Sequence, residues 1–211
     1  MKELVKIISL WLGRIYAAII SPSLCNALRS VSSYLYTGYQ SHRFHKWGKG
    51  SVMAWGVRLT HPEDIAVGED TEFYRESSLT TNSICHPGQP VIKIGNHCII
   101  GARTHITAIN SIEIGHNVII GESVLISDNS HGTSSLEMLN TPPIGRPLVS
   151  KGGVKIGDYV WVCDKVTILP GVTIGKNVIV GANSVVTTDI PDNCVVAGIP
   201  AKVVKRMDNQ E

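Results

Sequence analysis

Residues 154–186 read VKIGDYVWVCDKVTILPGVTIGKNVIVGANSVV, and an aliphatic residue recurs at every sixth position of this stretch. The series consists of Ile156, Val162, Ile168, Ile174, Val180 and Val186. A helix would repeat near 3.6 residues and an ordinary strand near two, so this period predicts one short strand and one turn per unit. Three units close one triangular coil, and stacked coils bury a continuous aliphatic column. The stretch therefore predicts a parallel β-helix.

The same six-residue period is also present earlier in the chain, before residue 127. Its members are Ile94, Ile100, Ile106 and Ile112, and, after a slip of two residues, Ile114, Ile120 and Ile126. Weaker members are Val67, Phe73 and Leu79. The following residue is often glycine, which allows a tight corner. We expect coils over residues 61–191, with a bulged corner or a looser turn at the slip.

Three segments lack the period. Residues 127–155 are rich in polar residues, Gly and Pro, and we expect a protruding loop that leaves and rejoins the coils. Residues 192–211 are expected to cap the end of the column and finish as a polar tail. Residues 1–60 are expected to form a helical and irregular segment. The predicted architecture is thus all-β, apart from a short N-terminal helical part.

The composition agrees with a strand-rich chain. Among 211 residues, Ile and Val together number 47, whereas Phe, Trp and Tyr together number 12. A formal net charge of +2 argues against nucleic acid as a partner. The five cysteines form no CxxC pair, so free thiols in the cytoplasm are expected rather than disulfides or a structural zinc site.

The first apolar segment, residues 4–20, contains Lys6 and Arg14. It falls short of the ~20 apolar residues that a transmembrane helix needs, and Arg14 would interrupt the apolar core of a signal peptide. We expect a helix that packs on the body or on another subunit. The alternative is peripheral contact with a membrane, with the basic residues at the lipid headgroups and the protein at the inner face.

Three stretches resemble the hexapeptide-repeat acyltransferases, and in particular their sugar and polysaccharide O-acetyltransferase branch. They are ISDNSHG at 126–132, VKIGDYVWVCDKVTILPGVTIG at 154–175 and VIVGANSVVTTDIPDNCVVAGIPAKVVK at 178–205. The resemblance covers about residues 60–205. It implies left-handed coils, a homotrimer, acetyl-CoA as the acyl donor, a sugar or polysaccharide precursor as the acceptor, and active sites between subunits that need no metal.

The resemblance also implies a catalytic histidine, and the neighbouring residues offer candidates for acceptor contact. His131 matches the catalytic histidine of the family, and an imidazole can remove the proton of a sugar hydroxyl near neutral pH. Asp128 is expected to orient that imidazole, to bind the acceptor, or only to shape a turn. Further candidates for acceptor contact are Asn129, Asn110, Arg146 and Tyr74.

The positions that match the family's donor site are Trp161, Gly181, Ala182, Thr187, Thr188, Ala201, Lys202 and Lys205. Trp161 is expected to face outward beside the pantetheine arm or to pack beneath the loop. The lysines can pair with the phosphates of coenzyme A. Cys163 stands where the family commonly has Gly, and we expect a small apolar residue there rather than a nucleophile.

Four other functions stay open from the sequence. Two are enzymes of the same general type, a serine O-acetyltransferase and an N-acyltransferase acting on a nucleotide-linked amino sugar. The third is a non-catalytic trimeric scaffold. The fourth is a zinc enzyme similar to γ-class carbonic anhydrase, which needs three histidine ligands. Its candidate ligands are His86, His97, His105, His116 and His131, but the close histidine pair of that family is absent.

Overall fold

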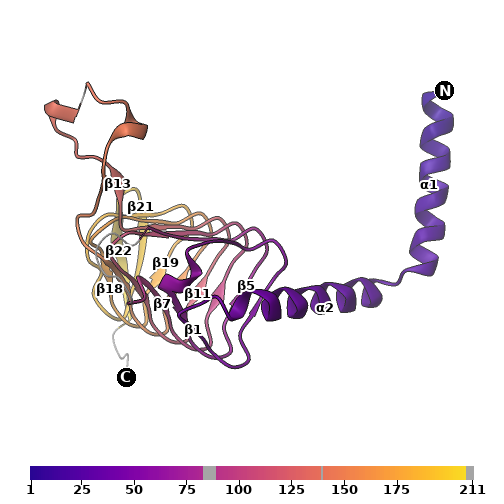
Figure 1. Ribbon diagram of the computed structural model, residues 1–211, viewed down its shortest axis with the longest axis horizontal. Helices are drawn as coiled ribbons and strands as arrows, with labels where there is room; N and C mark the ends of the chain where they lie inside the picture. Colours follow the sequence, from indigo (N-terminus) through magenta and orange to yellow (C-terminus); the bar gives the residue numbers. More distant parts are fainter. Residues whose placement is uncertain (83–88, 139, 208–211) are drawn as a thin grey trace.

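The computed structural model describes residues 1–82, 89–138 and 140–207. Two N-terminal helices, α1 (Lys2–Ile19) and α2 (Pro22–Ser41), precede a left-handed parallel β-helix whose stacked coils are seen in Figure 1. Each coil gives one short strand to each of three sheets, which we call sheets A, B and C after the order in which the chain visits them. The predicted fold class is therefore confirmed.

The three sheets contain the following strands. Sheet A consists of β1 (Lys46–Trp47), β4 (Ile65–Val67), β7 (Ile92–Ile94), β10 (Ile112–Ile114), β15 (Val154–Ile156) and β18 (Thr173–Ile174). Sheet B consists of β2 (Val52–Met53), β5 (Glu72–Phe73), β8 (Ile99–Ile100), β11 (Ile119–Ile120), β16 (Trp161–Val162), β19 (Ile179–Val180), β21 (Cys194–Gly198) and β22 (Ala201–Arg206). Sheet C consists of β3 (Arg58–Thr60), β6 (Ser78–Thr81), β9 (His105–Ala108), β12 (Leu125–Ser127), β17 (Thr167–Ile168) and β20 (Val185–Val186).

The aliphatic hexad positions form the core of the coils. Ile100 on sheet B and Ile106, Ile126 and Ile168 on sheet C are fully buried. Their strands pair in parallel and in register, so residues of the same type stack directly on each other along the column. Burying one such side chain stabilises the fold by ~1.5–3 kcal/mol, so the repeated column dominates stability.

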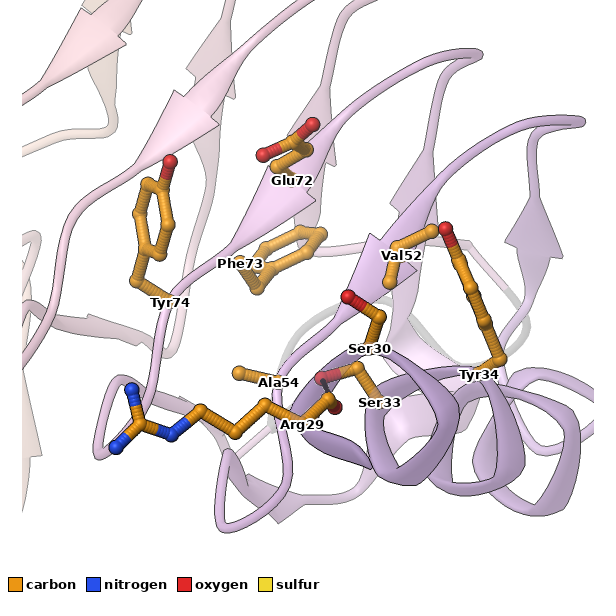
Figure 2. Close-up of a pocket in the computed structure, with 9 residues that line it drawn as sticks. All are labelled: Arg29, Ser30, Ser33, Tyr34, Val52, Ala54, Glu72, Phe73 and Tyr74. Carbon is orange, nitrogen blue, oxygen red and sulfur yellow. Dashed lines mark hydrogen bonds between the residues drawn. The ribbon is translucent and has the colours of Figure 1, made fainter. Parts of the chain in front are cut away.

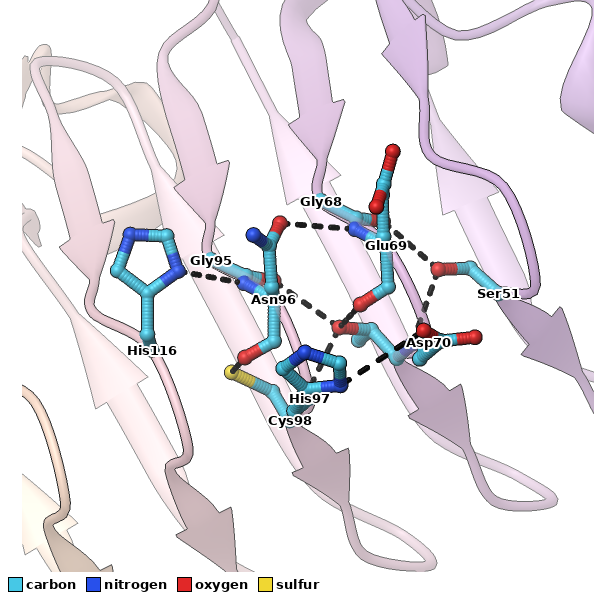
Figure 3. A network of polar contacts seen from close by, with 10 residues as sticks. Ser51, Gly68, Glu69, Asp70, Gly95, Asn96, His97, Cys98 and His116 are labelled. Carbon is cyan, nitrogen blue, oxygen red and sulfur yellow. Dashed lines mark hydrogen bonds and ion pairs between the residues drawn. The ribbon is translucent and has the colours of Figure 1, made fainter.

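Hydrogen bonds between successive coils hold the corner between sheets A and B. Asn96 Oδ1 accepts the backbone N–H of Glu69, and His116 Nδ1 accepts the backbone N–H of Asn96 (Figure 3). Asp158 Oδ1 in turn accepts the backbone N–H of His116. Glycine is required beside this ladder, because a Cβ at Gly95 would clash with the backbone of the next coil.

The slip in the hexad period lies in the turn between sheets C and A. Both Ile112 and Ile114 point inward from the three-residue strand β10, so the strand itself is regular. The extra residues form the turn 109–111, whose three backbone N–H groups donate to the carboxylate of Asp128. The extra residues of the slip therefore form a looser turn at this corner, while strand β10 stays regular.

The coils begin earlier than the predicted boundary at residue 61. Strands β1, β2 and β3 form a complete first coil before it. Trp47, Met53 and Leu59 keep the six-residue spacing there. Larger side chains replace the usual Ile and Val, since this coil must close the open end of the column. Residues 46–60 therefore belong to the β-helix.

The other end of the column continues past residue 191 as well. β21 pairs in parallel with β19, and β22 then runs antiparallel to β21. Cys194 and Val196 on β21 are fully buried in the core. Residues 194–206 thus extend sheet B and cover the end of the coils.

Helices α1 and α2 differ in their contact with the coils. α2 is held by the Tyr36 hydroxyl, which donates to the Val57 carbonyl, and by Thr37 Oγ1, which accepts the Met53 N–H. Side chains 2–18 of α1 are exposed, so the expected packing of this segment on the body of its own chain is wrong. Within the described residues, neither helix alone is long and apolar enough to cross a bilayer, although the bent pair taken together meets that length and composition.

Candidate active site

His131 lies at the neck of the loop that leaves the coils between sheets C and A. The neck consists of β13 (Ser130–His131) and β14 (Leu148–Val149), which pair antiparallel with His131 opposite Leu148. The loop then contains two short 3₁₀ turns, η2 (Leu136–Met138) and η3 (Pro143–Gly145). Figure 1 shows the loop projecting from the coils, as the absence of hexads over residues 127–155 predicts.

The His131 side chain is exposed and lines a groove of about 360 Å³ along the edge of sheet C. Its other lining residues are Thr60, His61, Thr80, Thr81, Asn82, Thr107, Ala108, Ile109, Asn129 and Leu148. Most of these lining residues carry hydroxyl, amide or imidazole groups. Such a surface offers hydrogen-bond donors and acceptors to a polyhydroxylated molecule and places an imidazole beside it.

Asp128 does not orient His131, contrary to the first role that the sequence suggests for it. Its carboxylate is fully buried and accepts the backbone N–H groups of 109–111 at 2.8–2.9 Å. The Asn129 side-chain amide donates to the same carboxylate at 3.1 Å. Asp128 therefore braces a turn, the third of the roles considered for it.

Of the four predicted acceptor contacts, Asn129 alone lines the His131 groove. Its amide also donates to the Thr107 carbonyl at 3.1 Å, which fixes the side chain at the floor of the groove. Asn110 takes part in the braced turn through its backbone. The Arg146 guanidinium donates to the Thr141 carbonyl at 2.8 Å within the loop, so Arg146 shapes the loop itself.

Tyr74 lies on a different face of the coils from His131. It follows β5 of sheet B and lines a pocket of about 280 Å³ between this sheet and α2 (Figure 2). Arg29, Ser30 and Ser33 of α2 form the other wall of that pocket. In one chain, Tyr74 therefore cannot contact a molecule held by His131.

His61 is a groove residue that the sequence analysis did not select. It adopts the left-handed backbone conformation directly before η1 (Pro62–Asp64), and its Nδ1 lies 3.2 Å from Oε1 of Glu63. Hydrogen bonds from the backbone and from His61 lower the pKa of the Glu63 carboxyl below its usual value. The polar HPED sequence at 61–64 could have indicated a functional position for His61, but residue 61 was expected to be only the start of the coils.

Trp161 faces outward from sheet B, as predicted, and is 50% exposed. On this face, Ile119, Trp161, Ile179 and Val195 are partners on successive strands, and Lys205 is the partner of Val195. An aromatic ring, three aliphatic side chains and a terminal ammonium group thus form one row. We call these five residues the sheet B row.

The remaining donor candidates are distributed around the end of the coils. Ala201 is buried and Lys202 exposed on β22, and both share sheet B with Trp161. Gly181 and Ala182 form the turn that leaves this sheet. Thr187 and Thr188 are exposed beyond β20 of sheet C. One chain therefore does not bring all of these residues to a single site.

Cys163 follows Trp161 and Val162 at the turn between sheets B and C. Burial raises the pKa of its thiol, and the neighbouring Asp164 acts in the same direction. A raised pKa lowers the fraction of the reactive thiolate at neutral pH. These properties agree with a structural residue and disfavour a nucleophile.

The described histidines considered for the zinc alternative lie in different features of one chain. Across residues 1–82, 89–138 and 140–207, no cluster of three or more His, Cys, Asp or Glu side chains is arranged to hold a metal ion. His116 uses Nδ1 in the ladder of corner hydrogen bonds. His86, one of the five candidates, lies outside the described residues.

Two family models match the coils. Residues 153–188 match the bacterial transferase hexapeptide (six repeats), and residues 91–127 match the hexapeptide repeat of succinyl-transferase. The chain is 40% identical over 127 residues to the putative lipopolysaccharide biosynthesis O-acetyl transferase WbbJ of Escherichia coli K12. That alignment covers 58% of this chain and 64% of WbbJ, so it spans a little under two thirds of the relative.

Two solved structures resemble this chain. A maltose O-acetyltransferase from Clostridium difficile 630 is 32% identical with a TM-score of 0.51, over 80% of this chain and 72% of that one. AntD, an N-acyltransferase from Bacillus cereus in complex with dTDP and 3-hydroxybutyryl-CoA, has a TM-score of 0.69 at 20% identity, over 84% and 90% of the two chains. The second likeness concerns the fold alone. The coils, the two repeat matches and the likeness to the maltose O-acetyltransferase together show that this chain belongs to the hexapeptide-repeat acyltransferases.

Proposed function

We propose that this protein transfers an acetyl group from acetyl-CoA to a hydroxyl of a sugar or polysaccharide precursor, with His131 as the general base. The observation that carries the proposal is the position of His131 in a groove of threonine, asparagine and histidine side chains at the neck of the loop. The names of the related sugar O-acetyltransferases support the same reaction class.

The chemistry needs one proton transfer in each direction. The His131 imidazole removes the proton of the acceptor hydroxyl while the oxygen attacks the thioester carbonyl carbon. The tetrahedral intermediate then collapses, the C–S bond breaks, and the imidazolium returns the proton to the sulfur of coenzyme A. The products are the acetyl ester and the free thiol, and the enzyme is regenerated without a covalent intermediate. His131 is exposed at the groove, so an acceptor can approach its ring directly.

The donor is proposed to lie along the sheet B row. The pantetheine arm is apolar and extended, and Trp161, Ile179 and Val195 offer it an apolar strip. Lys205 ends the strip and Lys202 lies on the same strand, where ammonium groups can pair with the phosphates of coenzyme A. Neighbouring strands are spaced about 4.8 Å apart, so the row is long enough for an extended arm.

A homotrimer is proposed because the catalytic and donor residues lie on different faces of one chain. The outward side of sheet A carries Lys46, Lys93, Glu113 and Lys155, and Lys93 pairs with Glu113 at 3.1 Å. The outward side of sheet B is instead the apolar row. We therefore place sheet B at the interface between subunits, where its apolar row is buried, and leave the charged sheet A exposed to water. Packing sheet B of one copy near sheet C of the next would bring Trp161 toward the neighbour's His131.

The decisive experiment measures acetyl transfer by the purified protein. Acetyl-CoA is supplied with a panel of monosaccharides, oligosaccharides, serine and nucleotide-linked amino sugars, and release of the coenzyme A thiol is followed together with the acceptor mass. An O-acetylated sugar supports the proposal. Transfer to serine or to an amino group instead would redirect it to one of the alternative acceptors, and absence of acetyl-CoA binding by calorimetry would favour a scaffold.

A further inference from the structure

The charge of the chain is divided unevenly between the part before the coils and the coils themselves. Residues 1–45 contain five Lys and Arg but a single acidic residue, Glu3. Residues 46–211 contain fourteen Lys and Arg and sixteen Asp and Glu. A chain with a net charge of only +2 therefore combines a basic N-terminal part with an acidic body. Such an asymmetry indicates a negatively charged partner for the N-terminal part.

α1 is amphipathic, and its apolar side is exposed among the described residues of the chain. At 3.6 residues per turn, Lys2, Lys6 and Gly13 lie along one side. The opposite side carries Leu4, Ile8, Trp11, Leu12 and Ile15, and all of these are exposed. Figure 1 shows α1 at the far end of α2, away from the coils. The apolar arc spans about half of the helix, which is wider than the narrow a/d seam of a coiled coil.

α2 is oriented in the reverse of the usual manner. It faces sheet B with Ser33, Thr37 and the buried Gln40, and Figure 2 shows Ser33 turned toward the pocket beside this sheet. Its apolar residues Leu24, Leu28, Val31 and Leu35 are 45–68% exposed on the other side. A surface helix normally buries its apolar side against the body. Among the described residues, two consecutive helices therefore present unpartnered apolar surface, and in α1 this surface is flanked by Lys6 and Arg14.

We infer that residues 2–41 bind the surface of an anionic lipid bilayer and hold the β-helix beside it. A wide apolar arc flanked by Lys and Arg is the pattern of a helix that lies in the headgroup region. The lipid is favoured over a second copy of the chain because both copies would bring the same basic residues, Lys2, Lys6 and Arg14, together. An anionic headgroup neutralises these charges, whereas like-charged helices repel.

Vesicle binding of the full chain tests this directly. The protein is sedimented with phosphatidylcholine vesicles that contain or lack phosphatidylglycerol, at low and at high salt. We expect binding to the anionic vesicles and its weakening by salt, since charge supplies part of the attraction. In vesicles with brominated acyl chains, Trp11 fluorescence should be quenched, and Trp11→Phe should remove most of that quenching while leaving binding intact.

Two variants separate the apolar and the basic contributions. Ile8→Glu with Leu12→Glu places charges in the centre of the apolar arc and should abolish binding. Lys6→Gln with Arg14→Gln should lower the partition coefficient about fivefold per charge, or ~25-fold together. Leu136→Glu is the control, because it changes an even more exposed leucine in the distant loop and should bind as the wild type does.

Three results would overturn the inference. The first is an absence of binding to anionic vesicles by the wild-type chain. The second is equal binding of the Ile8→Glu, Leu12→Glu variant and the wild type. The third is a change in solution mass on that substitution without vesicle binding by the wild type, which would assign the apolar faces to contacts between copies of the chain.

Discussion

Asp128 and His131 are three residues apart, yet the structure gives them separate environments. The Asp128 carboxylate points inward to the turn 109–111, where it accepts three backbone N–H groups. The His131 ring lies outside at the groove, on the first strand of the loop. The DNSHG stretch therefore combines a buried structural carboxylate with an exposed imidazole, and the two roles can be tested separately.

Asp128→Ala should strongly destabilise the fold. The substitution leaves three backbone N–H groups without acceptors in a turn that the coils enclose, and each costs ~1–3 kcal/mol. We expect a loss of about 3–5 kcal/mol in the free energy of unfolding. Thermal and urea unfolding at fixed protein concentration measure this loss.

Asp158→Ala is the matched control for this change. Asp158 caps a turn in the same way, but its carboxylate accepts one backbone N–H, from His116, and it is partly exposed. Its removal should cost only about 1 kcal/mol. Equal stability losses in the two variants would contradict the assignment of Asp128 as a brace.

The coils were predictable because their physical rule is local and repeated. Each inward position must hold a side chain that fits a narrow column, so Ile and Val recur at every sixth residue and reveal the fold. The first coil escaped prediction because Trp47 and Met53 fill the open end of the column with larger groups. A terminal coil has different neighbours, and the pattern changes with them.

The site was predictable in part. A histidine at the start of a non-repeating loop is visible in the sequence, but the direction of the Asp128 carboxylate depends on a turn seventeen to nineteen residues earlier. Likewise, the loop cannot reveal that Thr107 and His61 form its groove, since stacking brings them there from other coils. Contacts between coils depend on how the strands of successive coils align with each other, and a single sequence specifies this alignment only indirectly.

His131→Ala should lower kcat by ~10²–10⁴, the usual range for the loss of a positioned general base. Stability should be unchanged because the exposed side chain contributes nothing to the column. Donor affinity, measured by calorimetry with acetyl-CoA, should also be unchanged because the loss concerns the transition state. His97→Ala, at an exposed corner, is the control. Wild-type turnover by the His131 variant with its true acceptor would exclude this residue as the base.

Lys205→Glu should weaken acetyl-CoA binding roughly tenfold or more, because a hydrogen-bonded phosphate contact is replaced by repulsion. Trp161→Ala should weaken it as well, through the loss of the ring that the pantetheine arm contacts. Lys155→Glu on the charged sheet A is the control for the change in net charge. Calorimetric titration with acetyl-CoA and with coenzyme A measures each affinity, and normal affinities in both sheet B variants would place the donor elsewhere.

Ile119→Asp should dissociate the proposed trimer. Ile119 is 45% exposed in one chain and adjoins Trp161 in the sheet B row, so in the assembly we expect its side chain to be buried. The substitution removes ~1.5–3 kcal/mol of apolar burial per subunit and adds an unpaired carboxylate, which costs further. Each 1.4 kcal/mol weakens association about tenfold, so the mass measured by analytical ultracentrifugation should fall toward that of one chain.

Lys155→Asp introduces the same carboxylate on sheet A and should leave the mass unchanged. A wild-type protein with the mass of a single chain would refute the trimer, and an intact trimer in the Ile119 variant would show that sheet B is not its interface.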